Sequence, residues 1–246
     1  LIQPVYSFTL GFEDGLAAVG LSRKWGFIDK EGKMTVEPIY DRTFGFTEGV
    51  AAVELRRKWG VINTKGKMMI EPIFDQVNGF SEGLAPVEIN GKWGFIDKKG
   101  RILIQPVYSF TLGFEDGLAA VELNDDKWGF IDKEGKMVIQ PVYDDARWFS
   151  DGQAPIRLNG RWGFIDKKGK IIVQPTYESP EPLYGFREGL ASFTELNKFG
   201  FIDKSWKIVI QPVYDRIFSF SGGISRVGLN GKEGYIDRKG TQYWED

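Results

Sequence analysis

The residue types that most often carry acid–base, nucleophilic and metal chemistry are missing from this chain. Its 246 residues include no histidine and no cysteine. Histidine is the commonest general base and metal ligand, and cysteine is needed for disulfides and thiolate metal sites. Carboxylates are plentiful, but acid–base work needs two of them whose environments differ at one place. Here the acidic residues recur in a repeated pattern without a unique pair, so we expect no enzyme activity, no cofactor and no metal.

The Asp-x-x-Gly segments are the nearest approach to a metal-binding motif. Asp29 and Gly32 form one such segment, and similar ones recur along the chain. A calcium loop supplies about six oxygens, usually from several carboxylates. In this pattern a single Asp is followed by Lys, as in Asp29-Lys30. We therefore expect tight turns in which Asp accepts backbone hydrogen bonds and Gly adopts a positive φ.

Tryptophan is the other residue that could recognise a ligand, since a sugar ring can stack on an indole. The Trp-Gly pair occurs at Trp25, Trp59, Trp93, Trp128 and Trp162. A residue that keeps one place in a repeated pattern is more simply explained by packing. We expect these indoles in the core, and a sugar-stacking platform is the alternative.

These residues recur because the chain is a tandem repeat. From Trp25 the Trp-Gly positions continue as Phe199-Gly200 and Glu233-Gly234, with steps of 34, 34, 35, 34, 37 and 34 residues. Prolines give a second, independent measure of the period at Pro4, Pro38, Pro72, Pro106, Pro141, Pro175 and Pro212. A fixed period of this length predicts seven copies of one supersecondary unit.

Each copy contains four strand-sized segments. Segment A reads Leu-Ala-x-Val-x-Leu and ends in a turn such as Asn90-Gly91, which favours a tight hairpin. Segment B reads Lys-Trp-Gly-Phe-Ile-Asp, and a Lys-rich turn leads to segment C, which we expect to end at the proline because proline lacks a donor N–H. Segment D runs from Tyr-Asp to a Phe and varies most. Such spacing predicts antiparallel β structure throughout.

The strands are apolar on both faces. In segment B, Trp93 and Phe95 point one way and Ile96 the other. In segment C, Leu103 points to the face opposite that of the residues on either side of it. A sheet with one wet face would alternate more cleanly, so we expect every sheet to be covered by the copies beside it. On this view, the glycine after each tryptophan leaves room for the neighbouring copy.

Two architectures satisfy this demand: a closed seven-bladed, propeller-like toroid, and an open β-solenoid or superhelix. The chain ends favour the ring, because residues 224–244 supply segments A to C and residues 6–12 supply segment D. The N-terminal strand would then complete the last sheet and remove an exposed edge. The short unit favours the spiral. In either case we expect residues 1–246 to form a single domain.

The blocks Trp-Gly-Phe-Ile-Asp-Lys-x-Gly-Lys and Gln-Pro-x-Tyr-Asp make the chain similar to the WG-repeat (KWG-repeat) family, found mainly in bacteria. The resemblance covers essentially the whole chain. It departs from the pattern at Phe199 and Glu233, which replace Trp, at Asn63, which replaces Asp, and at Trp206, which replaces the turn Gly. The resemblance implies a binding or interaction module and supplies no catalytic residues.

Charge and hydropathy limit the partners. Thirty-two Lys and Arg against 34 Asp and Glu give a formal net charge of −2, whereas nucleic-acid binding depends on a basic face, so we expect no nucleic-acid partner. No apolar run approaches the roughly 20 residues of a membrane helix, so we expect no membrane span. The first residues do not resemble a signal peptide. We expect a monomer, and the sequence does not indicate a compartment.

Charges within the repeat form a pattern of their own. The B–C turns are rich in lysine, as at Lys98 and Lys167, and the D–A links are acidic, as at Asp14 and Glu82. Both connections should fall on the same rim of the molecule. We expect their charges to cancel largely in a solvated rim.

Residues that break the repeat are the best candidates for function, because the shared packing does not require them. Unit six also carries an insertion, residues 179–183. The candidate partner surface consists of Phe44, Trp148, Tyr184, Trp206, Phe218, Arg23, Arg56 and Arg57. Unselected drift between copies is the competing explanation.

Two binding functions fit these features. The first is a non-catalytic interaction scaffold that presents variable loops to a protein partner. The alternative is a carbohydrate-binding module that uses the non-repeating aromatics Trp148, Tyr184 and Trp206.

Overall fold

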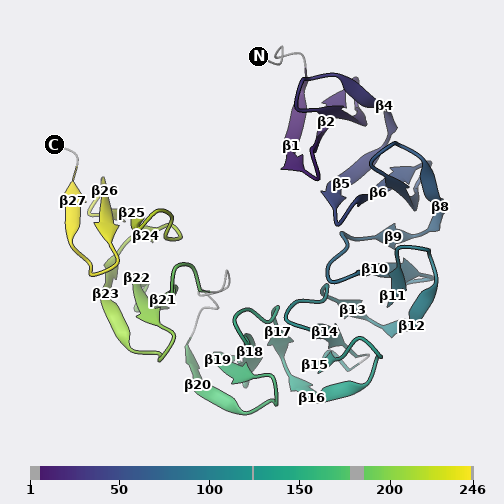
Figure 1. Ribbon diagram of the computed structural model, residues 1–246. Coiled ribbons are helices and arrows are strands. Elements are labelled where there is room, and N and C mark those ends of the chain that lie inside the picture. The colour runs from purple at the N-terminus through teal and green to yellow at the C-terminus, as the bar shows by residue number, and fades with distance from the viewer. Residues whose placement is uncertain (1–5, 124, 178–185, 245–246) are drawn as a thin grey trace. The chain divides into compact units, whose positions relative to one another are not determined.

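A computed structural model describes residues 6–123, 125–177 and 186–244. Their regular elements are β-strands, which form seven antiparallel sheets in chain order (Figure 1). Tyr184 and the insertion at 179–183 lie outside the described residues. Within the described part, no helix is long and apolar enough to cross a membrane.

The sheets follow the repeat. The first is β1–β4 (Phe8–Glu13, Leu16–Leu21, Lys24–Asp29, Met34–Tyr40), the second is β5–β8 (Arg42–Thr47, Val50–Leu55, Lys58–Asn63, Met68–Phe74), and the third is β9–β12 (Gln76–Val77, Leu84–Ile89, Lys92–Asp97, Ile102–Tyr108). The fourth is β13–β16 (Phe110–Thr111, Ala119–Glu122, Trp128–Ile131, Met137–Tyr143), and the fifth is β17–β20 (Asp145–Ala146, Gln153–Leu158, Arg161–Asp166, Ile171–Tyr177). The sixth is β21–β23 (Leu190–Glu195, Lys198–Asp203, Ile208–Tyr214), and the seventh is β24–β27 (Arg216–Ile217, Ile224–Leu229, Lys232–Asp237, Gln242–Trp244).

Segment D begins a sheet rather than completing the one before it. In the first sheet Phe8 of β1 pairs with Gly20 of β2, and in the last Gly234 of β26 pairs with Trp244 of β27. The prediction that the N-terminal strand completes the last sheet is therefore wrong. A short turn such as Asp14-Gly15 favours pairing with the next strand along the chain, because local closure costs less chain entropy.

The glycine after each tryptophan makes room for its own sheet. Trp59 pairs with Phe74, but Val61 pairs with Ile70, so β8 carries a bulge opposite Gly60. A Cβ on Gly60 would lie 2.5 Å from the Ile70 carbonyl oxygen. The prediction that this glycine admits the neighbouring copy is wrong. The same bulge holds Pro72 inside β8, so the proline does not end the strand as predicted, since a bulge tolerates the missing N–H.

A different glycine meets the neighbouring copy. Gly66, in the turn between β7 and β8, has a φ of +74°, and a Cβ there would lie 2.9 Å from Val36 Cγ2 of the preceding sheet. Gly100 stands in the same relation to Ile70, with the nearest approach at 3.2 Å. The turn glycine thus meets two demands at once, a left-handed backbone and a close approach between sheets.

The core lies between successive sheets, as predicted from the apolar faces of segment B. Trp93 and Phe95 pack with Phe114 and Val121 of the following sheet, whereas Ile96 packs with Trp59 and Phe74 of the preceding one. Each fully buried large side chain contributes roughly 1.5–3 kcal/mol relative to exposure. A sheet alone would leave both faces uncovered, so stacking supplies the stability.

The last strand of each sheet departs from this scheme. Its inner face is buried at Ile104 and Tyr108, but Leu103 and Val107 on the other face are about half exposed. The expectation that segment C is covered on both faces is therefore wrong. Segment C is an edge strand of its sheet, and its inner face is the one that meets a neighbouring copy, as at Ile70 and Gly100.

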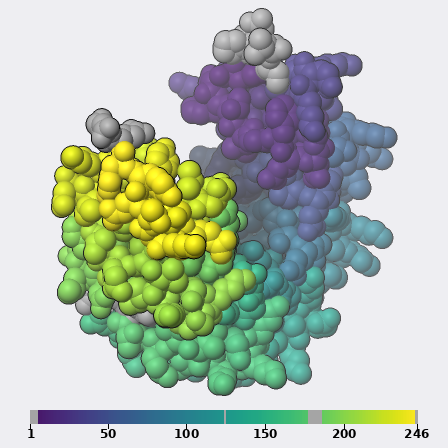
Figure 2. Space-filling model, turned by 60° about the vertical axis from the view of Figure 1, so that its left-hand side comes forward, coloured from purple at the N-terminus to yellow at the C-terminus, as the bar shows by residue number. Residues whose placement is uncertain are grey.

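The chain divides into two compact units, residues 1–137 and 138–246. The first holds β1–β15, and the division falls at the start of β16. In the second, Phe201, Ile210 and Tyr214 pack with Phe220 and Ile236 of the last sheet, and the two sheets meet in continuous contact in the space-filling view (yellow-green and yellow, Figure 2). A single domain over residues 1–246 stays a prediction.

Candidate functional site

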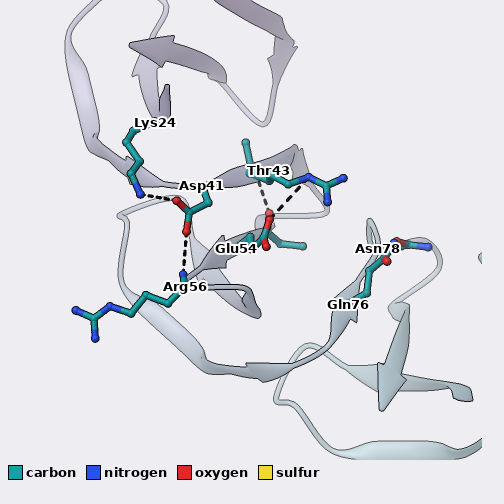
Figure 3. A network of polar contacts seen from close by, with 9 residues as sticks. Lys24, Asp41, Thr43, Glu54, Arg56, Gln76 and Asn78 are labelled. Carbon is teal, nitrogen blue, oxygen red and sulfur yellow. Dashed lines mark hydrogen bonds and ion pairs between the residues drawn. The ribbon is translucent and has the colours of Figure 1, made fainter. Parts of the chain in front are cut away.

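An aspartate at the start of segment D joins consecutive sheets. The Asp41 carboxylate accepts a hydrogen bond from Lys24 Nζ of the first sheet and, at 2.8 Å, from the backbone N–H of Arg56 in the second (Figure 3). Asp75 repeats this arrangement with Lys58 Nζ at 2.6 Å and the Asn90 N–H at 2.7 Å. The arrangement explains why the repeat has a lysine before tryptophan and an aspartate after tyrosine.

These contacts keep the aspartates charged. The hydrogen bond from Lys24, followed by that from the Arg56 N–H, holds the pKa of Asp41 below its usual value. Lys58 and then Asn90 lower the pKa of Asp75 in the same way. Because both carboxylates are fixed as acceptors, neither is suited to donate or shuttle a proton at neutral pH.

The acidic D–A links also hold the sheets together. Glu48 Oε2 accepts the backbone N–H of Gly83 in the next sheet at 3.0 Å, and Asp14 Oδ2 accepts that of Gly49 at 2.7 Å. Lys98 Nζ lies 3.2 Å from the Glu48 carboxylate. Similar ion pairs join Lys133 to Glu82 and Lys204 to Asp151. They confirm the predicted shared rim of lysine-rich turns and acidic links.

The Asp-x-x-Gly segments form the predicted turns. Asp97 Oδ1 accepts the backbone N–H groups of Lys99 and Arg101, each at 2.9 Å. Asn63, the exception in the sequence, makes the equivalent bonds with its amide oxygen at 3.0 Å. Over the residues that the structure describes, no group of three or more acidic, histidine or cysteine side chains could hold a metal ion.

The tryptophans belong to the core, as predicted, with one exception. Trp59, Trp93, Trp128 and Trp162 are buried, whereas Trp25 is only partly buried. Side chains from segment D cover the indoles. Phe44 stacks on Trp59 with ring centroids 5.1 Å apart and an interplanar angle of 18°, and the Arg147 guanidinium lies 5.1 Å from the Trp162 ring.

Segment D also exposes large side chains that differ from copy to copy. Phe44 and Trp148 are each 45% exposed and Phe218 is 49% exposed, with the Arg226 guanidinium 5.8 Å from the Phe218 ring. Phe110, which the sequence analysis did not single out, is 40% exposed and lies between Trp93 and Trp128. The sequence signal that could have identified Phe110 is an aromatic residue early in segment D.

Trp206 has a different environment from the other candidates. Its ring packs against Phe164, with centroids 3.9 Å apart, and against Phe186 at 5.6 Å. It is partly buried, and its φ of +66° is the left-handed value that the turn glycine has elsewhere. Its indole thus fills space between sheets. Tyr184 lies outside the described residues, so the structure does not place it.

The candidate arginines lie in neighbouring A–B turns. Arg23, Arg56 and Arg57 are exposed and have φ values of +64°, +53° and +64°. Asp41 brings the first two turns side by side, because it binds Lys24 of one and the Arg56 N–H of the other (Figure 3). Within residues 1–137, segment D and the A–B turns carry what we call the variable face: Phe44, Phe110, Arg23, Arg56 and Arg57. Trp148 and Phe218 belong to segment D in residues 138–246.

Comparison with known families identifies the repeat. A family model described as "WG containing repeat" matches residues 25–59, 59–93, 93–127, 128–162, 162–199 and 199–232. A search of curated proteins finds no significant match.

Solved structures show the same kind of fold at low sequence identity. A eukaryotic initiation factor matches with a TM-score of 0.66 and 13% identity, covering 97% of this chain and 75% of the other. The designed protein Ika8 matches with 0.59 and 14%, covering 95% and 84%. BamB from Moraxella catarrhalis matches with 0.57 and 12%, covering 96% and 86%. The fold is therefore all-β and similar to propellers.

Proposed function

Since this chain belongs to the WG-repeat family, we propose that it is a non-catalytic interaction scaffold whose variable face binds a protein partner. The repeated residues would build the framework, and the variable face would supply specificity. Propeller-like folds are compatible with such a role, and also with many others.

The observation that carries this proposal is the exposure of the aromatics on segment D. Tryptophan, tyrosine and arginine dominate the energetics of protein interfaces, because they bury large areas and offer directed polar contacts. Here Phe44 is 45% exposed and stacks on Trp59, and Arg56 and Arg57 are exposed in the A–B turn of the same sheet. The packing beneath is complete without further burial, since Trp59 is only 2% exposed.

The polar groups of the repeat support a non-catalytic role. Lys24, Lys58, Asp41 and Asp75 join neighbouring sheets, and Glu48 is bound to both Gly83 and Lys98. A catalytic group needs to be free to meet a substrate. The repeated carboxylates instead accept hydrogen bonds from backbone N–H groups.

A pull-down that compares two variants tests the scaffold. The parent chain is expected to retain partner proteins from a lysate of its own organism, and Phe44→Ser is expected to lose them. The matched control is Ile73→Ser, since Ile73 is 63% exposed but lies on the outer face of segment C. Equal loss with both variants, or retention of no protein by the parent chain, would contradict the proposal.

A carbohydrate ligand is the second candidate. The observation in its favour is that Trp148 presents an indole that is 45% exposed, and a sugar ring could stack on such a surface. A glycan array tests it. Binding that disappears with Trp148→Ala would favour the carbohydrate, and a blank array at high protein concentration would remove it.

A further inference from the structure

A cavity of about 290 Å³ opens beside the exceptional tryptophan, Trp25. It is lined by Ser7, Phe8, Gly20, Arg23, Lys24 and Trp25. The Phe8 and Trp25 rings lie nearly parallel, with centroids 6.3 Å apart and an interplanar angle of 29°. Phe8 is 68% exposed, so the cavity presents two aromatic surfaces to a ligand.

The fourth sheet shows what makes this cavity. There Phe110 pairs with Glu122, and Glu122 pairs with Trp128. In the first sheet Phe8 pairs with Gly20, and Gly20 with Trp25. The aromatic pair is therefore the same in both sheets, and the residue between the rings is glutamate in one and glycine in the other.

The missing side chain uncovers the indole. Trp128 is 8% exposed, but Trp25 is only partly buried. A Cβ on Gly20 would lie 3.4 Å from Phe8 Cβ and would meet nothing closer, so neither a close approach nor a positive φ requires glycine here. The second and third sheets also carry glutamate at this position, as Glu54 and Glu88. The seventh sheet has glycine here too, as Gly228, but that residue pairs with Glu233 and not with a tryptophan.

The rim of the cavity is positively charged. Lys24 binds Asp41, which compensates its charge. Arg23 is exposed, and the structure gives it no ion pair with any described residue. Two cations and one carboxylate leave an excess of one positive charge beside the aromatic surfaces. A guanidinium binds a carboxylate through two parallel hydrogen bonds.

We propose that this cavity binds an aromatic ring that carries a carboxylate. The ring would stack against Trp25 and Phe8, and the carboxylate would pair with Arg23. A cavity of about 150 Å³ accommodates benzene in another protein, so 290 Å³ holds one ring with a short acidic substituent. The same chemistry could come from a small aromatic acid or from an aromatic residue next to an acidic one in a polypeptide.

N-acetyl-phenylalanine is a suitable probe, and its primary amide is the uncharged control. The signals of the indole N–H groups in a ¹⁵N-labelled chain report the binding, and Trp25→Phe identifies the signal of Trp25. We expect the acid to shift that signal with a Kd on the order of millimolar, and the amide to bind about tenfold more weakly because it loses the charged hydrogen bonds.

Two variants use residues that the chain's own copies already carry. Gly20→Glu restores the glutamate of the next three sheets and should abolish binding without unfolding the chain. Arg23→Gly restores a consensus turn glycine and should weaken the acid about tenfold. Arg57→Gly is the matched control, because Arg57 has the same φ of +64° in the next turn but does not line the cavity.

The proposal is overturned if the acid leaves the Trp25 signal unchanged, if acid and amide bind equally, or if Gly20→Glu binds like the parent chain. A peptide with an internal Phe-Asp pair and an amidated end distinguishes the sources. Binding by this peptide points to a polypeptide ligand, and binding by the free acid alone points to a small molecule. Neither result depends on partner binding at Phe44, so this site and the scaffold can fail separately.

Discussion

Gly60→Ala offers the sharpest test of how this repeat is built. The added Cβ would lie 2.5 Å from the Ile70 carbonyl oxygen and 2.9 Å from the Pro72 nitrogen. Both are backbone atoms of the adjacent strand in the same sheet, so no side-chain rotation relieves the clash. Gly60 does not have a positive φ, and the substitution therefore probes steric contact alone.

The expected loss follows from the displacement required. The strand must move by several tenths of an ångström, which breaks its register with β7 and disturbs the buried side chains beneath it. Overpacking of this kind costs about 1–3 kcal/mol, and we expect a value near the top, about 3 kcal/mol. For a chain of this size, about 1 kcal/mol corresponds to roughly 2–4 °C in Tm, so Tm should fall by roughly 6–12 °C.

Two further glycines provide controls. Gly91 has a φ of +74° with nothing within 4 Å of an added Cβ, and Gly113 has neither a positive φ nor a neighbour within that distance. We expect Gly91→Ala to cost about 1 kcal/mol through its backbone conformation and Gly113→Ala to stay within about 0.5 kcal/mol of the parent. Calorimetry and tryptophan fluorescence on heating measure all three. If Gly60→Ala melts no lower than Gly91→Ala, the steric explanation of the Trp-Gly pair is wrong.

Three other outcomes follow from the contacts between sheets. Asp75 has a lowered pKa in the folded chain, so its contribution to stability is present above its unfolded pKa of about 3.9 and is lost as pH falls through the lower folded value. Urea titrations between pH 2 and 7 should show that Asp75→Asn loses less unfolding free energy on acidification than the parent. An equal loss would contradict the role of the Lys58 contact. Trp206→Gly relieves a strained backbone but empties the space beside two phenylalanines. We expect the free energy of unfolding, measured in urea, to fall by about 2 kcal/mol. A stabilised variant would show that the indole does not pack. Lys98→Gln should change stability by less than about 1 kcal/mol, and 0.5 M salt should reduce the difference from the parent; a larger effect that survives salt would show that the pair with Glu48 is not a screened surface contact.

Several features of the fold were accessible from the sequence because they are local. Alternation in segment B placed Trp93 and Phe95 on one face and Ile96 on the other, and the structure confirms this. The Asp97 turn was equally readable, because an aspartate two and four residues before free backbone N–H groups can accept from both. Such inferences need only the geometry of a few consecutive residues.

Other features were misjudged because they depend on distant backbone. The role of Gly60 is set by a bulge ten residues away, and nothing in the Trp-Gly pair indicates where that bulge lies. The pairing of β1 with β2 was also missed. Phe110 was overlooked, since its relation to Trp93 and Trp128 depends on how the sheets stack. The role of Gly20 depends on its place between Phe8 and Trp25, which is set by the pairing of three strands.

The sequence alone determined that this protein is an all-β tandem repeat of seven copies, because a fixed period and alternating apolar residues can be recognised without any long-range contact. It also determined that histidine and cysteine are absent. Tertiary structure decided which strand begins each sheet, which glycine faces the neighbouring copy, and which aromatic residues remain accessible. Those outcomes depend on distances between segments 10 to 35 residues apart, and such distances are fixed only when the sheets pack.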